Sequence, residues 1–279
     1  MKDDQSSDTA LGATVIRAVH QVLDTRPLIL EDPISPLLVG DDGMRAIQEN
    51  PGRHATLAAR GLRSHIVLRS RYAEDELRLA SGSGITQFIN LGAGFDTFAF
   101  RQPGWAGRLK IVEVDHPATQ AAKREALEKA RITVAPNVDF LPLDLERSAF
   151  LLAAAAPFLD ASRPTFVACL GVLAYLRPQT TESVFHAVAK MPRGSRLLFA
   201  FASHEPSALT PGASVAERTA ARGEPWLTRF DASELEPRLL SIGFRTVVFL
   251  DPARAAARYY RDRTDLPAPR KTRLCQAVV

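Results

Sequence analysis

Apolar positions recur at helical spacing along the first eighty residues. Between Thr9 and Leu23 they lie three and four residues apart, which predicts an amphipathic helix that covers another part of the protein. Three prolines between positions 27 and 36 interrupt the pattern, which resumes from about Arg53 to Ala80 with a kink expected near Gly61. We therefore expect an N-terminal helical cap or lid over residues 1–80.

Short apolar runs after residue 85 predict strands that alternate with helices. This alternation is typical of a doubly wound α/β sheet. We predict an α/β fold with a Rossmann-like sheet of seven strands, mostly parallel, whose last strand is antiparallel. The expected strands span 86–91, 109–115, 138–142, 165–169, 196–201, 244–250 and 273–279, and the expected helices span 117–130, 146–156, 180–190, 233–242 and 252–261.

The stretch between the fifth expected strand and the next helix has a different composition. Five prolines and glycines fall between residues 203 and 228 and break regular structure there. Long irregular insertions of this kind often carry function. We expect residues 81–279 to form the core, with the insertion around 203–228 building part of a substrate pocket.

A glycine-rich turn follows the first expected strand, in the stretch Phe88–Thr97 (FINLGAGFDT). Gly92 and Gly94 let the backbone come close to a ligand where a side chain would block it. The next expected strand ends in Asp115, twenty-one positions after Gly94. In a doubly wound sheet, an acid at this place can accept hydrogen bonds from the ribose hydroxyls. Together these features predict a nucleoside site.

The turn departs from the pattern that binds a dinucleotide. That pattern needs a third glycine, so that a helix N-terminus can take the pyrophosphate, but Thr97 stands at this place and Asp96 precedes it. A carboxylate repels a pyrophosphate and attracts a sulfonium or an amino group. The turn therefore favours S-adenosyl-L-methionine, with S-adenosyl-L-homocysteine as the product. Alternatively, Asp96 serves only to cap the following helix.

The turn is also part of a longer resemblance. Residues 90–101 (NLGAGFDTFAFR) and 113–120 (EVDHPATQ) resemble the leucine carboxyl methyltransferase-like family. The likeness runs from about Arg17 to the end of the chain and weakens after Phe201. It implies an S-adenosyl-L-methionine-dependent O-methyltransferase of the kind found in bacterial secondary metabolism, on the methyltransferase form of the Rossmann-like sheet.

The resemblance implies roles for further residues. An arginine of the segment 69–75 (RSRYAED) reaches the carboxylate of the cofactor's methionine part in the family, and a guanidinium fork suits that task. We favour Arg71 over Arg69. Asp144 and Leu145, just after the third expected strand, match the place that contacts adenine, although Asp144 could instead cap the helix that follows.

One position departs from the family pattern. Many members carry a glutamate immediately before the glycine of the segment 171–176 (GVLAYL), where this chain has Leu170. The substitution puts in doubt a carboxylate role near the sulfonium or the substrate at this point. The rest of the segment is kept, so we expect the loop to keep its geometry.

Methyl transfer from a sulfonium requires alignment of the reacting atoms and exclusion of water more than it requires a reactive side chain. A carboxylate acceptor is ionised at pH 7, whereas a hydroxyl acceptor gains from a general base. His204, just past the fifth expected strand, is the preferred candidate for that base and His116 is the second, although a lone histidine is more often structural. Tyr175 could orient the acceptor or pack under the cap.

Composition narrows the class of protein. A net charge of +4, with 46% hydrophobic and 24% charged residues, is ordinary for a soluble globule, and no clustered basic face indicates nucleic acid. Cys169 and Cys275 give neither a disulfide framework nor metal spacing, so we expect buried thiols and no metal. No apolar run approaches the roughly 20 residues of a membrane span, and the N-terminus lacks an apolar signal core. We expect a cytoplasmic protein without a membrane partner, and its oligomeric state stays open.

Two rival functions remain beside methyl transfer. An NAD(P)-dependent oxidoreductase uses a related sheet, but the missing third glycine and Asp96 disfavour it. A cofactor-binding protein that has lost catalysis is suggested by Leu170 alone. The leading prediction is an O-methyltransferase that acts on a carboxyl or hydroxyl oxygen of a small-molecule metabolite, whose identity lies beyond the sequence.

Overall fold

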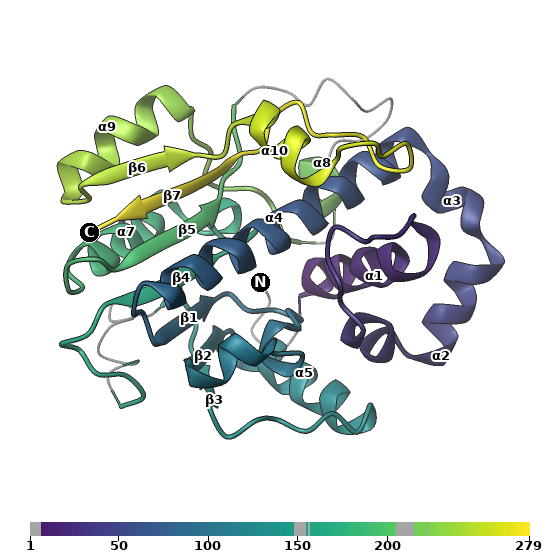
Figure 1. Cartoon of the computed structure of the whole chain (residues 1–279), viewed down its shortest axis with the longest axis horizontal. Helices are drawn as coiled ribbons and strands as arrows, with labels where there is room; N and C mark the ends of the chain where they lie inside the picture. Colours follow the sequence, from purple (N-terminus) through teal and green to yellow (C-terminus); the bar gives the residue numbers. More distant parts are fainter. Residues whose placement is uncertain (1–6, 148–154, 156, 205–214, 222) are drawn as a thin grey trace.

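The structure, a computed structural model, describes residues 7–147, 155, 157–204, 215–221 and 223–279. Within them, seven strands form a sheet in the order β3-β2-β1-β4-β5-β7-β6, in which β7 runs antiparallel to both of its neighbours and the other pairs are parallel (Figure 1). The predicted fold class is confirmed. The strands are β1 (Gln87–Leu91), β2 (Lys110–Asp115), β3 (Val138–Pro142), β4 (Thr165–Cys169), β5 (Arg196–Ala200), β6 (Thr246–Phe249) and β7 (Leu274–Val278).

Helices precede the sheet and alternate with its strands, largely as predicted. The predicted helix 146–156 lies mostly outside the described residues. Short 3-10 helices, η1 (Phe98–Phe100), η2 (Gly104–Arg108) and η3 (Leu173–Tyr175), follow β1 and β4. The α-helices are α1 (Asp8–Leu23), α2 (Ile34–Glu49), α3 (Pro51–Ala55), α4 (Leu57–Gly82), α5 (Pro117–Lys129), α7 (Pro178–Ala189), α8 (Val215–Ala220), α9 (Ala232–Ile242) and α10 (Pro252–Tyr259).

Helices cover both faces of the sheet, because its strands present apolar side chains on both sides. On one face, Leu77 of α4 belongs to the same apolar cluster as Phe88 of β1. On the other face, Phe185 of α7 and Leu239 of α9 share a cluster with Val167 of β4. The carboxyl ends of β1, β2 and β4 lie between these layers and are the place where a ligand can approach the sheet.

Two features of the N-terminal helices differ from the prediction. Helix α2 was not expected, because three prolines precede or enter it. Pro33 is its N-cap and Pro36 lies in its first turn, where a missing N–H costs little, and Gly40 (φ 74°, ψ 169°) interrupts it. The kink predicted near Gly61 is wrong: the helix breaks at Thr56, whose side chain caps α4.

Helix α4 belongs to the core of the sheet. Val67, Leu68 and Leu77 are almost fully buried in the cluster that also holds the strand residues of that face. The expected boundary at residue 80 therefore does not separate two hydrophobic cores. The division into a cap of residues 1–80 and a catalytic core of residues 81–279 stays a prediction about function.

A buried ion pair fastens α1 to α4. Asp24, which ends α1, accepts hydrogen bonds from Arg63 of α4, at 2.7 Å from Nε and 2.8 Å from Nη2. His20 lies beside the same carboxylate, with Nδ1 2.7 Å from Oδ2. Burial opposes the effect, but the bonds from His20 and Arg63 lower the pKa of Asp24. The N-terminal helix is therefore held firmly against the sheet-covering helix.

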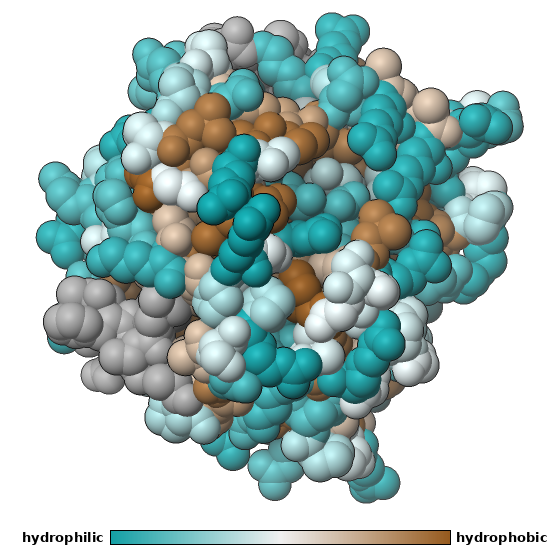
Figure 2. All heavy atoms as spheres, turned by 60° about the vertical axis from the view of Figure 1, so that its left-hand side comes forward, coloured by the Kyte–Doolittle hydropathy of each residue, from teal (hydrophilic) through white to brown (hydrophobic). Residues whose placement is uncertain are grey.

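The surface is mixed in character. On the face shown in Figure 2, hydrophobic residues gather in patches that hydrophilic side chains separate. None of the helices in the described part of the chain combines the length and apolar composition that a bilayer crossing requires. Cys169 and Cys275 are buried in β4 and β7 with free thiols, as predicted.

A second buried ion pair joins β2 to α5. Lys123 Nζ lies 2.6 Å from Glu113 Oε2, and both side chains are 1% exposed. The ammonium also lies 5.0 Å from the centre of the Phe100 ring. Burial raises the pKa of Glu113, and Lys123 opposes this effect. Each charge depends on the other, because a buried charge without a partner is very unfavourable.

Replacing Lys123 with methionine should destabilise the fold by about 3–5 kcal/mol, because the Glu113 carboxylate stays buried without its partner. Urea unfolding followed by circular dichroism measures the change in the free energy of unfolding. The double variant Glu113→Leu/Lys123→Met should recover most of the loss, since an apolar pair can replace a buried ion pair. A loss below about 1 kcal/mol in the single variant, the size expected for an exposed pair, would contradict this account.

Candidate functional site

The site begins at the turn between β1 and η1. Gly92 (φ 68°) and Gly94 (φ 47°) both adopt the left-handed conformation that favours glycine. The backbone N–H groups of Gly92 and Ala93 donate to the carbonyl oxygen of Val114, at 2.7 and 3.1 Å. These bonds tie the turn to the end of β2. The tight glycine turn expected from the sequence is therefore present.

Asp115 stands at the end of β2, beside this turn. Its Oδ2 accepts a hydrogen bond from the backbone N–H of Gly94, and its Oδ1 accepts one from the N–H of His116 at 2.7 Å. Burial raises the pKa of Asp115, and these two backbone bonds oppose the effect. Each carboxylate oxygen has a further lone pair, so Asp115 can accept hydrogen bonds from a diol next to the turn. Its role as the ribose acid stays a prediction.

Two glycines mark where β1, β4 and α4 meet. A Cβ added to Gly92 would lie 2.2 Å from Cγ2 of Val172, and one added to Gly171 (φ 75°) would lie 2.5 Å from Nη1 of Arg69. Neither distance is possible for real atoms. The segment after β4 therefore packs on the turn after β1, and the guanidinium of α4 reaches over the end of β4.

Arg69 is a half-buried cation at this meeting point. Burial, and then the positive charge of Arg17, lowers the pKa of Arg69 to about 10, while Tyr175 and Asp96 oppose the effect. Among the residues that the structure describes, no carboxylate forms an ion pair with it. A guanidinium in these surroundings is suited to pair with a carboxylate that a ligand brings.

Arg71, which is favoured from the sequence, already has hydrogen-bond partners within the protein. Arg71 Nε donates to Asp75 Oδ1 at 3.1 Å, its Nη1 donates to the carbonyl of Ile29 at 3.3 Å, and its side chain is 40% exposed. Positions two apart on a helix are about 200° apart around its axis, so the two arginines face different sides of α4. Arg69 is the one that reaches the end of β4, and the choice between the two arginines for the cofactor carboxylate stays a prediction.

A chain of buried ion pairs holds α1 and α4 against the turn. Nε of Arg17, in α1, lies 3.0 Å from Oδ2 of Asp32. Nη2 of the same arginine donates to the carbonyl oxygen of Phe95 at 2.6 Å. Arg101, which follows η1, lies 3.5 Å from Asp32 and donates two hydrogen bonds to Glu74 of α4. These side chains were not identified from the sequence, because ion pairs between distant positions leave no local pattern.

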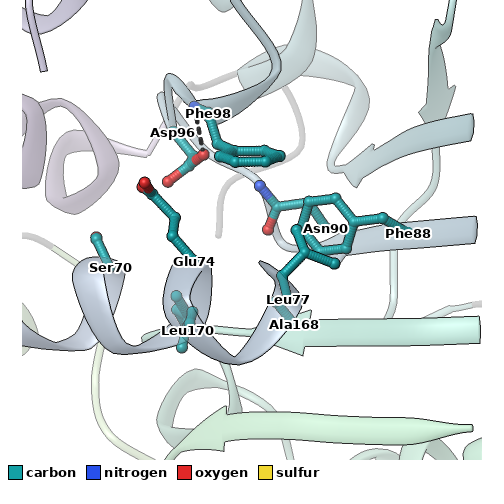
Figure 3. Close-up of a pocket in the computed structure, with 10 residues that line it drawn as sticks. Ser70, Glu74, Leu77, Phe88, Asn90, Asp96, Phe98, Ala168 and Leu170 are labelled. Atoms are coloured by element: carbon teal, nitrogen blue, oxygen red, sulfur yellow. Dashed lines mark hydrogen bonds between the residues drawn. The ribbon is translucent and has the colours of Figure 1, made fainter. Parts of the chain in front are cut away.

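A small hollow opens between α4 and the ends of β1 and β4 (Figure 3). The carboxylates of Glu74 and Asp96 point toward each other at one end of it, and Asp96 Oδ1 accepts a hydrogen bond from the Phe98 N–H at 2.9 Å. Burial raises the pKa of Glu74, and Arg101 opposes this. Leu170 lines the same hollow. Its acidic groups therefore come from α4 and the turn, and not from position 170.

Asp144 and Leu145 lie close to the end of β2. The N–H of Leu143 donates to the carbonyl of Asp115 at 2.8 Å, which brings the start of this loop to Asp115. Asp144 Oδ1 accepts a hydrogen bond from the N–H of Glu146 at 2.9 Å, so the capping alternative has a bond to support it. Contact of Asp144 and Leu145 with adenine stays a prediction.

The histidine and tyrosine proposed for catalysis have different surroundings. Tyr175 ends η3 and is half-buried beside Arg69. His204 is exposed, and the segment that follows it lies outside the described residues. His116 caps α5, because its Nδ1 accepts a hydrogen bond from the N–H of Ala118 at 3.3 Å. Of the two favoured candidates, Tyr175 is the one within electrostatic range of Arg69.

His65 was not identified from the sequence. It lies one helical turn before Arg69 on the same face of α4, and it is half-buried. Burial, followed by the charges of Arg69 and Arg273, lowers the pKa of His65 to about 3. Its imidazole is therefore uncharged at neutral pH. The four-residue spacing to Arg69 was the signal that could have found it.

The sequence is similar to those of proteins named as methyltransferases. A family model described as leucine carboxyl methyltransferase matches residues 10–189. YktD of Bacillus subtilis (strain 168), which carries the name of an S-adenosyl-L-methionine-dependent methyltransferase, is 28% identical over 294 residues, covering 95% of each chain. A protein of Mycolicibacterium smegmatis (strain ATCC 700084 / mc(2)155) with the same kind of name is 31% identical over 204 residues, covering 70% of this chain and 66% of its own length.

Solved structures share the fold. A DUF574 family protein from Streptomyces avermitilis MA-4680 superposes with a TM-score of 0.58 at 18% identity, covering 99% of this chain and 98% of that one. A protein of Thermobifida fusca YX described as a methyltransferase superposes with a TM-score of 0.56 at 20% identity, covering 95% and 92%. At these identities the likeness shows the architecture alone.

The packing of Gly92 gives a prediction for stability. Gly92→Ala should destabilise the protein by about 2–4 kcal/mol, because the new Cβ meets Val172 and because the positive φ is unfavourable for alanine. Gly84→Ala is the matched control. Gly84 also has a positive φ (100°), but nothing lies within 4 Å of its added Cβ, so it should lose only the conformational part, about 1–2 kcal/mol.

A double-mutant cycle separates the clash from the backbone effect. Combining Gly92→Ala with Val172→Ala should show a coupling free energy of at least about 1 kcal/mol in urea unfolding, whereas Gly84→Ala with Val172→Ala should show none. Equal losses at the two glycines, without coupling to Val172, would show that the turn is not packed against the segment after β4.

Proposed function

The chain belongs to the leucine carboxyl methyltransferase family, and on this premise we propose that it transfers a methyl group from S-adenosyl-L-methionine to a carboxyl or hydroxyl oxygen of a small molecule. Its family is one of S-adenosyl-L-methionine-dependent methyltransferases. The cofactor supplies, when bound, an electrophilic methyl group on a positively charged sulfur. The family accounts for the cofactor and for methyl transfer. Our proposal adds the type of acceptor oxygen and the residues that bind the cofactor and the acceptor.

The observation that carries the proposal is the state of Arg69. It is a half-buried guanidinium at the end of β4 with no ion-pair partner among the described carboxylates. S-adenosyl-L-methionine has a carboxylate on its methionine part, and a guanidinium binds a carboxylate through two parallel hydrogen bonds. We therefore assign the methionine carboxylate to Arg69, in place of Arg71.

The other parts of the cofactor suit the residues around the turn. Each carboxylate oxygen of Asp115 accepts one hydrogen bond from a backbone N–H group and can accept another. Asp115 therefore suits the ribose hydroxyls. Asp144 and Leu145, beside it, suit the adenine. The carboxylate of Asp96, which lines the hollow, suits the positive charge of the amino and sulfonium groups, whereas Glu74 is paired with Arg101.

The same charges argue against the rival functions. A pyrophosphate would bring negative charge to a turn that carries Asp96, so a dinucleotide fits poorly. The second rival, a protein without catalysis, rested on Leu170. Since Glu74 and Asp96 provide carboxylates in the same hollow, the leucine alone is not a sign of lost catalysis.

The task of the chain in this reaction is to align the reactants and keep water out. Arg69 and Asp115 hold the cofactor at two points that are fixed by α4 and β2. Helix α1 passes over the turn, since a Cβ on Gly94 would lie 3.0 Å from the Cβ of Ala10, and it shields the turn from solvent. Tyr175, which is half-buried and within electrostatic range of Arg69, is our candidate to orient the acceptor.

The proton balance depends on the acceptor. A carboxylate is already ionised at pH 7 and needs no base. A hydroxyl acceptor has to lose a proton, and His65, with a pKa of about 3, is too weak a base to take it at neutral pH. His204 remains the candidate for that role, since Nδ1 of His116 already caps α5.

Replacing Arg69 tests the carboxylate assignment. Arg69→Gln should weaken the binding of S-adenosyl-L-homocysteine by about 10- to 100-fold, because a charged, two-point hydrogen bond is lost. Arg69→Lys should weaken it less, since it keeps the charge and loses the fork. Isothermal titration calorimetry gives the affinities.

Arg71→Gln is the matched control, because it removes the same group two positions along the same helix. It should leave the affinity unchanged and lower the stability slightly through the lost bond to Asp75. If Arg71→Gln loses affinity while Arg69→Gln keeps it, the assignment is reversed. If both variants bind as the wild type does, the carboxylate is held elsewhere.

The nature of the acceptor oxygen can be read from the stability of the product. We expect the protein to transfer label from methyl-labelled S-adenosyl-L-methionine to a low-molecular-weight fraction of a bacterial extract. A methyl ester releases methanol in mild alkali, whereas a methyl ether does not, so the alkaline release of label separates carboxyl from hydroxyl acceptors. The proposal would be overturned if the label were found only in protein, or if the labelled methyl group were bound to nitrogen and not to oxygen.

A further inference from the structure

Arg229 and Arg273 lie at the carboxyl end of β5 and are not among the residues assigned to the cofactor. The N–H of Phe230 donates to the carbonyl of Ala202 at 2.8 Å, and the N–H of Phe201 donates to the carbonyl of Arg273 at 3.1 Å. Two separate segments therefore bring these arginines to the same short stretch of chain. Neither was singled out from the sequence for this role.

Arg229 is held with its charge accessible. Its guanidinium carbon lies 5.4 Å from the centre of the Trp226 ring, and its Nη1 donates to the carbonyl of Ser203 at 3.4 Å. The residue is exposed, and within the described part of the chain no acidic side chain forms an ion pair with it. An arginine stacked on an indole keeps its orientation and can still bind an anion.

Two more donors lie in the same place. Trp226 Nε1 and Ser203 Oγ are buried, and neither forms a hydrogen bond with any described residue. Ser203 is 8% exposed. Buried donors in folded proteins nearly always have partners. Both groups are therefore suited to a ligand that brings acceptor oxygens.

Arg273 adds a second positive charge. Its φ of 50° is uncommon for a residue with a side chain. Bonds on both sides hold this conformation: Thr272 Oγ1 donates to the carbonyl of Leu250, and the N–H of Leu250 donates to the carbonyl of Leu274 at 3.0 Å. Burial, followed by the charge of Arg229, lowers the pKa of Arg273. Arg273 therefore adds positive charge beside Arg229, and an anion bound there would be attracted to both guanidinium groups.

This arginine pair adjoins the proposed cofactor site. After burial, the charges of Arg69 and Arg273 are the influences that lower the pKa of His65, so the imidazole lies within the field of both. The carbonyl of Ala174, in η3, accepts a hydrogen bond from the N–H of Leu227 at 2.6 Å. The segment that carries the stacked arginine therefore runs along η3, next to the place proposed for the acceptor.

We propose that Arg229 and Arg273, with Trp226 Nε1 and Ser203 Oγ, bind an anionic group of the methyl acceptor, such as a carboxylate, sulfonate or phosphate. The proposal rests on the proposed function, because it names the chemical class of acceptor for the same site. The hydrogen bonds from two guanidinium groups occupy the lone pairs of the oxygens that they bind, and those oxygens are therefore poor nucleophiles. The bound group is therefore an anchor, and a different oxygen of the acceptor is methylated.

Matched acid and amide pairs test the anchor without knowledge of the natural acceptor. The probes are benzoate and benzamide, indole-3-acetate and indole-3-acetamide, and octanoate and octanamide, each titrated into protein saturated with S-adenosyl-L-homocysteine. At least one acid should bind about tenfold or more tightly than its amide, because the amide lacks the charge. The preference should decrease as salt is added, since part of the site is exposed.

Variants assign the preference to the arginines. Arg229→Gln and Arg273→Gln should each reduce the affinity for the acid about tenfold and leave that for the amide unchanged. Arg245→Gln, an exposed arginine before β6, is the matched control and should change neither. Because Arg229 is exposed, its variant is expected to fold, and an unchanged isotherm for S-adenosyl-L-homocysteine verifies this.

The outcomes separate the two proposals. If the wild type binds S-adenosyl-L-homocysteine but no acid is preferred over its amide, or if the preference survives Arg229→Gln, the anchor is wrong and the cofactor assignment stands. If the wild type does not bind S-adenosyl-L-homocysteine, both are overturned. A preference that Arg229→Gln and Arg273→Gln remove, and that Arg245→Gln keeps, supports the anchor.

Discussion

The geometry of the site depends on Arg101. Its guanidinium donates two hydrogen bonds to Glu74 of α4 and lies 3.5 Å from Asp32, which in turn pairs with Arg17 of α1. Removing one partner from such a buried network leaves an uncompensated charge, so the network is stable only when complete. Because Arg17 also donates to the carbonyl of Phe95, the glycine turn, α1 and α4 have one arrangement relative to one another.

Helix α4 then separates two roles on two faces. One face presents Arg69 to the end of β4, where a carboxylate of the cofactor would complete the charge balance. The other presents Asp75, which bonds Arg71 at 3.1 Å, Arg258 at 2.7 Å and the Tyr259 hydroxyl at 2.8 Å and so fastens α10 to the helix. In this proposal, one side of α4 binds the cofactor through Arg69, and the other side stabilises the packing of α10 through Asp75.

Local patterns explain which features the sequence could predict. The periodicity of apolar residues predicts the strands and helices of the sheet. The spacing of Gly92, Gly94 and Asp115 predicts the glycine turn and the acid at the end of β2. Both patterns depend only on residues that are near one another in the chain. The choice between Arg69 and Arg71 depended on the rotation of α4 about its axis, which only packing decides. The effect of Leu170 could not be read locally either, since the carboxylate of Glu74 that enters the same hollow comes from ninety-six positions earlier. Ion pairs such as Arg17 with Asp32 left no signal at all.

We expect the turn and the charges around it to accept an S-adenosyl nucleoside and not a dinucleotide. Calorimetric titration of the wild-type protein with S-adenosyl-L-homocysteine and, separately, with NAD⁺ tests it most directly. We expect one-to-one binding of S-adenosyl-L-homocysteine and no binding heat with NAD⁺ at the same concentrations. Binding of NAD⁺ without binding of S-adenosyl-L-homocysteine would contradict the account.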